Sequence, residues 1–458
     1  MYPCRYFLLF LAIPLCFSGR LVQCRPFEHL EKTSDYRVSS YISASPSPSP
    51  ENYNPPQISS LISVFNVLSY GALGDGLSDD TLAFKTAWDL ACRANVPAVF
   101  LVPGHYTFLI QSTIFTGPCG NGLVFQIEGS LIPPDGPDSW SKIYNKRQWL
   151  VFYRVNGMTM QGGGVIDGKG EKWWNLPCKP HRGVNGTTVS GPCDSPVAIR
   201  FYGSSNLTVQ GLKIRNSPQF HFRFDYCNSV RIDSLSIKSP ATSPNTDGIH
   251  IENSNDVKIY NSIVANGDDC VSIGAGSYNV DIRNITCGPS HGISIGSLGM
   301  KNSRACVSNI TVSDSVITQS DNGVRIKTWQ GGFGSVSRVA FANIRMDKVR
   351  NPIIIDQYYC DSKGKCPNQT SAVYVSGVSY TSIKGTYDPR GPPVRFTCSD
   401  TVPCTNLTLR AVELSPAAGK VGRWGAPFCW NAYGDDGKAL CLAEGLPELL
   451  PVSDADKC

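Results

Sequence analysis

Four polar motifs follow one another in the middle of the chain: NTDG at residues 245–248, GDDC at 267–270, GPSHG at 288–292 and RIK at 325–327. Their spacing is regular, because 22 residues separate Asp247 from Asp269 and another 22 separate Asp269 from His291. A polar site repeated at a period of roughly 20–30 residues is typical of a solenoid, in which each repeat forms one coil. Equivalent positions on successive coils are spatial neighbours, so we expect the four motifs to line one strip of surface.

Short strand-like segments recur in step with these motifs. They follow one another every 23 to 30 residues, at 207–209, 230–232, 257–259, 280–282, 310–312 and 339–341. In most of them apolar and polar side chains alternate, which places one face inward. Asn, Asp or Ser precedes most of them, and stacked side chains of this kind can hydrogen-bond from coil to coil. The pattern predicts an all-β fold, a single-stranded parallel β-helix.

One segment ahead of the repeats favours a helix. Residues 78–81 (Ser-Asp-Asp-Thr) supply capping side chains, and carboxylates suit a first helical turn. An apolar face then follows, which consists of Leu82, Phe84, Ala87, Trp88 and Ala91. We expect this capping helix to cover the open N-terminal end of the solenoid, because an uncapped stack exposes unpaired edges.

The composition is that of a globular protein, with 41% hydrophobic and 17% charged residues among 458. The formal net charge is +5, and the sequence has no Lys/Arg run of the kind that follows nucleic acid. We therefore expect no nucleic-acid partner, whereas a polyanion such as a uronic-acid polymer is compatible with the charge. The protein is expected to act as a monomer.

The chain divides into four parts. Residues 1–24 have the pattern of a signal peptide, and their apolar run is too short for a helix that spans a bilayer. Residues 25–60 contain Ser-Pro repeats and favour a disordered tether. Residues 61–440 are expected to form the solenoid, and 441–458 a C-terminal tail pinned by disulfides. No later stretch of about 18 apolar residues occurs, so we expect a secreted, extracellular protein without a membrane partner.

Eighteen cysteines in an exported chain predict disulfides. Closeness in sequence favours five pairs: Cys92–Cys119, Cys178–Cys193, Cys270–Cys287, Cys360–Cys366 and Cys398–Cys404. Cys227 and Cys306 are expected to be buried free thiols, and no pairing is assigned to Cys429, Cys441 and Cys458. The Cys/His spacings match no zinc pattern. Six Asn-X-Ser/Thr sequons predict surface glycosylation, at Asn185, Asn206, Asn284, Asn309, Asn368 and Asn406.

Hydrolysis of a glycosidic bond needs a carboxylic acid that protonates the leaving oxygen and a carboxylate that activates water or attacks, and Asp247, Asp268 and Asp269 would supply these groups. Crowding of carboxylates raises the pKa of at least one of them toward the working range of an acid. Asp268 and Asp269 would point to opposite faces of a regular strand, so we expect a bend or bulge at Gly267 to bring both into the groove. His291, one coil further on, is expected to hydrogen-bond the acid.

Arg325 and Lys327 share one exposed strand face, with Ile326 turned inward, and two cations there suit a substrate that carries carboxylates. Tyr358 is expected to contact a sugar, with Tyr359 on the opposite strand face nearly as favoured. Taken singly, each motif is more commonly a turn, a loop or a solvated strand edge. Together and in coil register, they indicate a glycoside hydrolase that acts on an acidic polysaccharide.

Clustered aspartates also suit calcium. Calcium takes about six to eight oxygen ligands, and the neighbouring Arg, Lys and His side chains would oppose a further cation. We therefore expect no metal and no cofactor.

The four motifs in this order resemble those of the plant-type polygalacturonases, a family of pectin-degrading glycoside hydrolases, from residue 64 to about residue 440. The resemblance implies a right-handed parallel β-helix and a location in the cell wall. It also implies that the protein hydrolyses α-1,4-galacturonosyl linkages of homogalacturonan with inversion. It implies that Asp268 is the general acid, that Asp247 and Asp269 activate water, and that His291 supports the acid. The substrate-binding residues that it implies are Asn245, Arg325, Lys327 and Tyr358.

Three alternatives stay open. A rhamnogalacturonan or xylogalacturonan hydrolase would share the fold, although the Arg-Ile-Lys cations favour a uronate at the cleaved position. A pectate lyase would use calcium and a cationic base in place of the aspartates. A non-catalytic wall-binding β-helix would have lost Asp268 or His291, and both are present. Loops around 169–195 and 329–336 would decide between endo and exo action, which the sequence leaves open.

Overall fold

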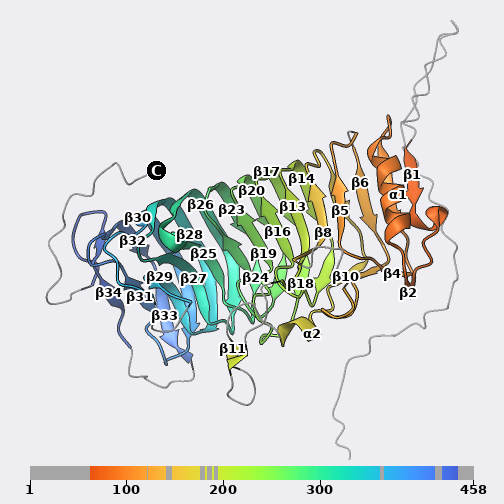
Figure 1. The fold of residues 1–458 in the computed structure, drawn as a ribbon. Helices are drawn as coiled ribbons and strands as arrows, with labels where there is room; N and C mark the ends of the chain where they lie inside the picture. Colours follow the sequence, from red (N-terminus) through yellow and green to blue (C-terminus); the bar gives the residue numbers. More distant parts are fainter. Residues whose placement is uncertain are drawn as a thin grey trace, which may run out of the picture. The chain divides into compact units, whose positions relative to one another are not determined.

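The computed structural model describes residues 62–120, 122–140, 147–175, 181–182, 188–189, 194–361, 366–417, 425–441 and 458. The expected leader and tether, residues 1–24 and 25–60, lie outside this part of the chain. The predicted all-β fold, a right-handed parallel β-helix, is confirmed. Its coils lie side by side along one axis, and their strands form three parallel stacks (Figure 1).

The strands of each stack pair only in parallel. The first stack contains β1 (Ser63–Asn66), β3 (Ala98–Val102), β6 (Val124–Ile127), β9 (Thr159–Gln161), β14 (Ser205–Gln210), β17 (Asn228–Asp233), β20 (Asn255–Tyr260), β23 (Ser277–Arg283), β26 (Arg304–Thr318), β28 (Phe333–Val349), β30 (Tyr374–Tyr387), β32 (Cys404–Arg410) and β35 (Ala432–Gly434). The second stack contains β2 (Asp75–Asp79), β4 (Thr107–Leu109), β7 (Ser130–Ile132), β10 (Val165–Asp167), β15 (Lys213–Arg215), β18 (Ser236–Lys238), β21 (Ile263–Ala265), β24 (Thr286–Cys287), the second halves of β26, β28 and β30, and β33 (Glu413–Pro416).

The third stack forms a sheet of its own. It contains β5 (Thr113–Thr116), β8 (Gln148–Tyr153), β13 (Val197–Tyr202), β16 (Phe222–Asp225), β19 (Ile249–Glu252), β22 (Val271–Ile273), β25 (Ile293–Leu298), β27 (Asn322–Trp329), β29 (Asn351–Tyr359), β31 (Val394–Thr397) and β34 (Phe428–Trp430). The remaining elements are short: η1 (Val67–Tyr70), α2 (Glu171–Trp174), η2 (Met300–Asn302) and the antiparallel pair β11 (His181–Arg182) and β12 (Thr188–Val189).

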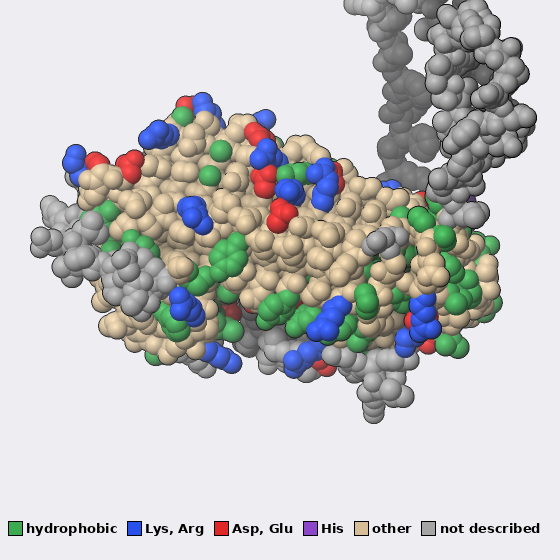
Figure 2. Space-filling view, turned by 90° about the horizontal axis from the view of Figure 1, so that it is seen from above, with side chains coloured by type: hydrophobic (Ala, Val, Ile, Leu, Met, Phe, Trp, Pro, Cys, Tyr) green, Lys and Arg blue, Asp and Glu red, His purple; other side chains and the backbone are tan. Residues whose placement is uncertain are grey.

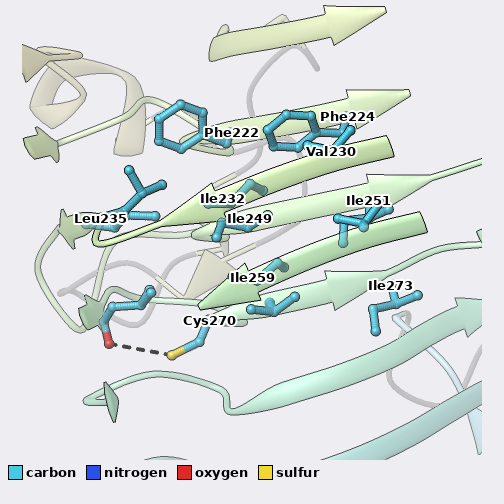
Figure 3. Close-up of a cluster of buried hydrophobic side chains, with 14 of the residues drawn as sticks. Phe222, Phe224, Val230, Ile232, Leu235, Ile249, Ile251, Ile259, Cys270 and Ile273 are labelled. Atoms are coloured by element: carbon cyan, nitrogen blue, oxygen red, sulfur yellow. Dashed lines mark hydrogen bonds between the residues drawn. The ribbon is translucent and has the colours of Figure 1, made fainter. Parts of the chain in front are cut away.

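Alternation of side chains fills the solenoid with apolar layers. On β17, Val230 and Ile232 are buried while Arg231 between them is exposed. Val230 pairs with Val257 on β20, and Val257 pairs with Val280 on β23, so successive coils repeat one apolar position. Figure 3 shows such layers between the stacks. Burial of each such side chain contributes about 1.5–3 kcal/mol, and a one-residue slip would turn it to solvent, so these layers determine the register.

Helix α1 (Thr81–Cys92) covers the N-terminal end of the stack, as predicted. Phe84 and Trp88 lie against Phe100 on β3, with ring centroids 5.6 and 6.2 Å apart. The prediction for Leu82 is wrong, because this side chain is 76% exposed. The helix turns Ala83 toward the first coil in its place, and Ala83 is buried beside Phe84.

Asparagine side chains form a ladder along the first stack, as predicted. The Nδ2 atom of Asn255 donates to Asn228 Oδ1 (2.9 Å), that of Asn279 donates to Asn255 Oδ1 (2.7 Å), and that of Asn309 donates to Asn279 Oδ1 (2.6 Å). The sequon asparagines in the described residues are all exposed: Asn206, Asn284, Asn309, Asn368 and Asn406. Asn185 lies outside them, and glycosylation stays a prediction.

Six disulfides join described cysteines. Four are expected pairs: Cys92–Cys119, Cys270–Cys287, Cys360–Cys366 and Cys398–Cys404. The expected pair Cys178–Cys193 lies outside the described residues. The prediction that Cys306 is free is wrong, because Cys306 on β26 bonds to Cys458, a partner 152 residues away that short spacing could not reveal. Cys429 pairs with Cys441, and Cys227 is a buried free thiol.

Charged side chains of both signs lie next to one another on the face seen from above in Figure 1, and the surface between them is mostly uncharged (Figure 2). Such a face presents a mixed electrostatic field.

Candidate active site

The four motifs meet on the outer face of the third stack. Outward-facing residues there share one register position on successive strands from β13 to β34, and we call this set the groove column. The groove column consists of Arg200, Arg223, His250, Ser272, Ser294, Arg325, Ile354, Arg395 and Phe428. Because neighbouring strands lie about 4.8 Å apart, the column runs along the solenoid and crosses every coil that carries a motif.

The 22-residue spacing brings three motif residues to equivalent places. Asp247, Asp269 and His291 each lie two residues before the first residue of a strand. These strands are β19, β22 and β25, and their first residues pair in register. Their side chains therefore lie beside one another where the strands begin, next to the groove column. The expectation that the repeat would make them neighbours agrees with this geometry.

Both aspartates of the GDDC motif reach the site because the chain bends before β22. At Gly267 the backbone lies so close to the preceding coil that a Cβ would be 2.0 Å from the carbonyl oxygen of Ser243. Gly267 also donates its amide to Thr246 Oγ1 (3.1 Å). Only glycine permits so close an approach, so the bend lies where it was expected.

Asp269 is the most buried of the three carboxylates, with 1% of its side chain exposed. Its Oδ1 accepts from Arg325 (2.8 Å) and from Ser294 Oγ (2.8 Å), and its Oδ2 accepts from Lys327 Nζ (2.9 Å). Burial works to raise the pKa of Asp269, but Lys327 and then Arg325 outweigh it and hold the pKa below its ordinary value. Asp269 is therefore ionised over the whole physiological range.

The two cations of the RIK motif were expected on an exposed face, and this prediction is wrong. The side chains of Arg325 and Lys327 are 13% and 9% exposed, and both bond to Asp269. Ile326 between them is buried, as predicted. Arg325 and Lys327 first of all hold a carboxylate of the protein, because they reach back over β25 to the turn before β22.

Asp268 and His291 form a second pair. His291 Nδ1 lies 3.0 Å from Asp268 Oδ1, and the amide of His291 donates to the Asp268 carbonyl (2.7 Å). Burial lowers the pKa of His291, but the hydrogen bond and charge of Asp268 outweigh it and raise the pKa above its ordinary value. Asn245 Nδ2 lies 3.4 Å from Asp268 Oδ2. With 17% of its side chain exposed, Asp268 is the most accessible carboxylate of the three.

Asp247 is buried and is held by uncharged groups. Its Oδ2 accepts from Ser272 Oγ (2.6 Å), and its carbonyl lies 3.0 Å from His221 Nδ1. Burial, then the charges of Asp268 and Asp269, raise the pKa of Asp247 well above its ordinary value. His221 is itself fully buried, which lowers its pKa to about 4, so it is neutral beneath the site. In the free protein, Asp247 therefore holds a proton more readily than an exposed aspartate does.

Several residues of the site were missed by sequence reasoning. Ser272 and Ser294 position Asp247 and Asp269, and His250 Nδ1 lies 2.8 Å from Ser272 Oγ. The signal that could have found them is the motif period itself, because His250, Ser272 and Ser294 are again 22 residues apart. They were passed over because serine in a strand carries no chemical signal of its own.

Tyr359, and not Tyr358, faces the three aspartates. Tyr359 lines the same cavity as Asp268, and Lys327 Nζ lies 5.4 Å from the centre of its ring. Tyr358 points to a separate pocket, where its hydroxyl accepts from the amide of Asp400 (2.9 Å). The reason is a register shift, because Lys327 pairs with Asp356 while Trp329 pairs with Tyr359, which leaves one extra residue on β29.

The cavity at the carboxylates encloses about 310 Å³. Its lining includes Asn245, Asp247, Asp268, Asp269, His250, Lys327 and Tyr359. One oxygen from each aspartate lies within 4.8 Å of the others, which is close enough for a cation. A calcium ion there would compete with the Lys327 ammonium for Asp269, so the cluster suits internal cations better than a metal.

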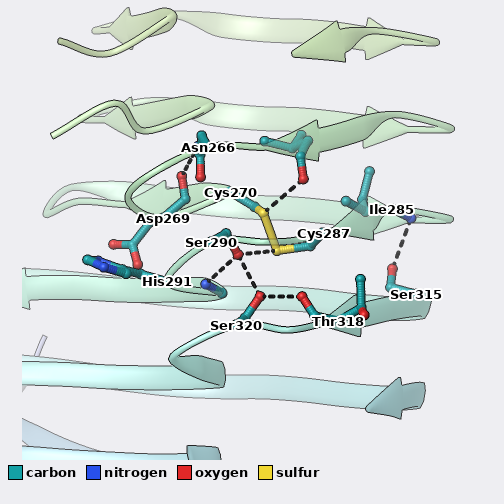
Figure 4. Close-up of a disulfide and its surroundings, with 12 residues drawn as sticks. Asn266, Asp269, Cys270, Ile285, Cys287, Ser290, His291, Ser315, Thr318 and Ser320 are labelled. Carbon is teal, nitrogen blue, oxygen red and sulfur yellow. Dashed lines mark hydrogen bonds between the residues drawn. A yellow bond between two sulfur atoms is a disulfide. The ribbon is translucent and has the colours of Figure 1, made fainter. Parts of the chain in front are cut away.

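The disulfide Cys270–Cys287 braces the site from below (Figure 4). It joins the residue after Asp269 to the segment that leads into the His291 turn. That turn is held in addition by Ser290, whose Oγ accepts from the Gly292 amide (2.9 Å) and lies 2.9 Å from Ser320 Oγ. The disulfide thus joins the GDDC motif to the residue that immediately precedes the GPSHG motif.

Comparisons with known proteins show which family the chain resembles. The family described as "Glycosyl hydrolases family 28" matches residues 92–423. A protein of Arabidopsis thaliana described as a "probable polygalacturonase" is 44% identical over 81% of this chain and 81% of its own length. Polygalacturonase-2 of Solanum lycopersicum is 43% identical over 78% of this chain and 76% of its own length. The endo-xylogalacturonan hydrolase of Aspergillus tubingensis has a similar structure, with a TM-score of 0.68, 25% identity, and coverage of 84% of this chain and 100% of that one.

Among the helices in the described part of the chain, none is both long and apolar enough to cross a membrane.

Proposed function

Because the chain belongs to glycosyl hydrolases family 28, and is therefore a glycoside hydrolase, we propose that it cleaves α-1,4-galacturonosyl linkages of homogalacturonan. The observation that carries the proposal is the cluster of three aspartates, in which Asp268 faces the cavity beside His291 while Asp269 is held ionised by two cations. The cavity lies on a solenoid face long enough for a polymer. Two relatives that are 44% and 43% identical over most of this chain are named polygalacturonases, which supports a galacturonate polymer as the substrate.

We assign the general acid to Asp268. It is the most accessible of the three carboxylates, and it would donate a proton to the glycosidic oxygen as the bond to the anomeric carbon breaks. His291 and Asn245 hold its two oxygens, which orients the carboxyl group toward the cavity. His291 is a positioning residue in this assignment.

Asp247 and Asp269 would take the proton of the attacking water. The raised pKa of Asp247 is compatible with this role, because part of the rise comes from the charge of Asp268. When Asp268 carries the proton, that repulsion disappears and Asp247 can ionise. Asp269 stays ionised throughout, so the three groups share a single proton, which serves as the acid proton when it resides on Asp268.

Inversion at the anomeric carbon is part of the proposal and rests on family membership. One oxygen from each aspartate lies within 4.8 Å of the others, whereas the carboxyl groups of inverting enzymes are usually roughly 6.5–9.5 Å apart. Spacing by itself therefore does not favour inversion over retention here. Water would have to bind beside the carboxylates, toward the cavity, and not directly between them.

Recognition of the uronate would fall to Lys327 and Tyr359. Lys327 lines the cavity, and its ammonium has three donors, one of which is used by Asp269. Arg325 does not line the cavity and serves mainly to hold Asp269. We also propose that the protein acts as a secreted monomer in the cell wall, where homogalacturonan is found, without nucleic-acid or membrane partners.

The test is to incubate the purified protein with de-esterified homogalacturonan in the presence of EDTA. We expect new reducing ends without unsaturated products, at the same rate with and without the chelator, because internal cations hold the aspartates. Proton NMR of the first products is expected to show the β-anomer before mutarotation. Unsaturated products, or activity that needs calcium, would contradict the proposal, and cleavage restricted to a branched pectin would favour the branched-pectin alternative.

The raised pKa of His291 predicts a change of activity and stability above pH 6.5. A histidine whose folded pKa is raised stabilises the protein fully below its unfolded pKa, and this contribution is lost as the pH rises through the folded value. We expect Tm and kcat to fall together in that window. In the His291→Gln variant, Tm and kcat should be lower but should not change with pH in this range. If this variant lost activity above pH 6.5 as the wild type does, a group other than His291 would cause the loss.

A further inference from the structure

The groove column is electrostatically different on the two sides of the catalytic aspartates. On the side of β13 and β16 each arginine is neutralised by an acid, because Arg200 bonds to Asp225 (2.6 Å) and Arg223 bonds to Asp225 (2.9 Å) and Glu252 (2.8 Å). On the side of β31, the guanidinium of Arg395 is exposed and has no ion pair with any residue in the described part of the chain. A chain of uronates would therefore be attracted most strongly on the β31 side.

A second cavity surrounds Arg395. It encloses about 390 Å³, and its lining includes Arg350, Arg390, Arg395, Pro392 and Phe428. Arg350 is exposed and, like Arg395, forms no ion pair within the described residues. Arg390 is already bound to Asp388, with Nε 2.8 Å from Oδ2. Two of the three guanidinium groups are thus available to an incoming anion.

The chemistry of this cavity suits one unit of a uronate polymer. A guanidinium group presents parallel N–H donors that match the two oxygens of a carboxylate. Phe428, which is 44% exposed, offers an apolar surface to a sugar ring beside these donors. The combination of cations with one aromatic ring distinguishes this cavity from the pocket at Tyr358, whose lining contains no cation.

The cavity lies on the path of a chain that occupies the catalytic cavity. Arg395 shares the groove column with Arg325, and only Ile354 on β29 separates them, so the distance along the column is two strand spacings, about 9.6 Å. Hydrogen bonds also link the second cavity to the His291 turn, because Asn351 of that cavity donates to the Asp321 carbonyl (3.0 Å). Asp321 Oδ2 in turn lies 3.6 Å from His291 Nε2.

We propose that Arg350, Arg395 and Phe428 form a distal uronate subsite, which binds an unesterified galacturonate of the same chain whose linkage is cleaved at Asp268. The inference rests on the proposed function and adds a requirement for free carboxylates at a distance from the cleaved bond. A methyl ester removes the charge that the two arginines recognise, so the subsite selects de-esterified stretches of the polymer.

The test uses Arg350→Gln, Arg395→Gln and the double variant, with Arg345→Gln as the matched control. Arg345 is an exposed arginine on β28, in the second stack and away from the groove column. We expect kcat/KM on long de-esterified galacturonan to fall by about three- to tenfold in each single variant, because an exposed charge-assisted contact is lost. Arg345→Gln should match the wild type, and Tm should change little in all variants because these exposed arginines form no ion pair within the described residues.

Length, charge and salt give independent readouts. Galacturonate oligomers too short to reach from Asp268 to Arg395 should be cleaved equally by all variants, and the loss should appear once the oligomer spans both cavities. Highly methyl-esterified chains should show no difference between variants and wild type. The KM of the wild type on long chains should rise with salt more steeply than that of the double variant.

The outcomes separate this inference from the proposed function. If the wild type cleaves no galacturonan, the proposed function fails. If the wild type cleaves it and the arginine variants are equally active on every length, or lose activity equally on short and long oligomers, the distal subsite is refuted while the proposed function stands.

Discussion

Turnover of homogalacturonan by the Asp268→Asn variant is expected to fall by about 10²–10⁴-fold, because a positioned general acid contributes a factor of this size. Asparagine keeps an oxygen that can accept from the Asp269 amide (2.9 Å), so the turn before β22 should be retained. The measurement is kcat on the polymer, with Tm as the check on folding. The matched control is Asp256→Asn, a half-buried aspartate on β20 in the first stack, which contacts Lys258 and Ser229 away from the groove column.

A loss of turnover does not by itself distinguish an acid from a base, so the substrate should be varied. An aryl galacturonide with a good leaving group needs little protonation as its bond breaks. Asp268→Asn should therefore recover much of its activity on this substrate, whereas Asp247→Asn should stay inactive because water activation is still required. The reverse pattern would assign the acid to Asp247, whose raised pKa makes it the competing candidate.

Long-range periodicity carried most of what could be predicted. Asp247, Asp269 and His291 are neighbours because a repeat of 22 residues matches one coil, and a spacing of this kind is readable without knowledge of any contact. The same holds for the asparagine ladder, which follows from stacking alone. The period predicts which backbone positions become neighbours, but it does not predict how far a long side chain extends across the stack.

The failures follow from that limit. Arg325 and Lys327 were expected on an exposed face, but they extend back across one strand to Asp269, 56 and 58 residues earlier. Tyr358 was favoured only slightly over Tyr359, and one extra residue on β29, which the sequence does not reveal, decides which of the two faces the cavity. Cys306 was left free because its partner, Cys458, is brought back by a segment without any repeat.

The burial of Lys327 leads to the second large effect, a loss of stability in Lys327→Met. Its side chain is 9% exposed and bonds to Asp269, which is 1% exposed. Removal of one partner of a buried ion pair leaves the other charge poorly compensated and typically costs about 3–5 kcal/mol. Arg325 still contacts Asp269, so we expect a value near the lower end, about 3 kcal/mol, together with loss of activity.

An exposed pair of the same type is the control. Lys384 lies 3.0 Å from Glu413, and these side chains are 56% and 64% exposed. Lys384→Met should change the free energy of unfolding by no more than about 1 kcal/mol, because exposed ion pairs contribute little. Chemical denaturation of both variants is the measurement, and equal stability of Lys327→Met and Lys384→Met would contradict the buried pair.

The double variant Asp269→Asn/Lys327→Met separates stability from catalysis. This variant removes both charges of the pair but leaves Arg325 without its carboxylate partner, and the difference from additivity measures the coupling of Asp269 with Lys327. Its activity should stay at background, because Asp269 is then no longer a carboxylate that can accept the proton of water. If activity returned with stability, Asp269 and Lys327 would be structural supports of the site, and Asp247 alone would be the base.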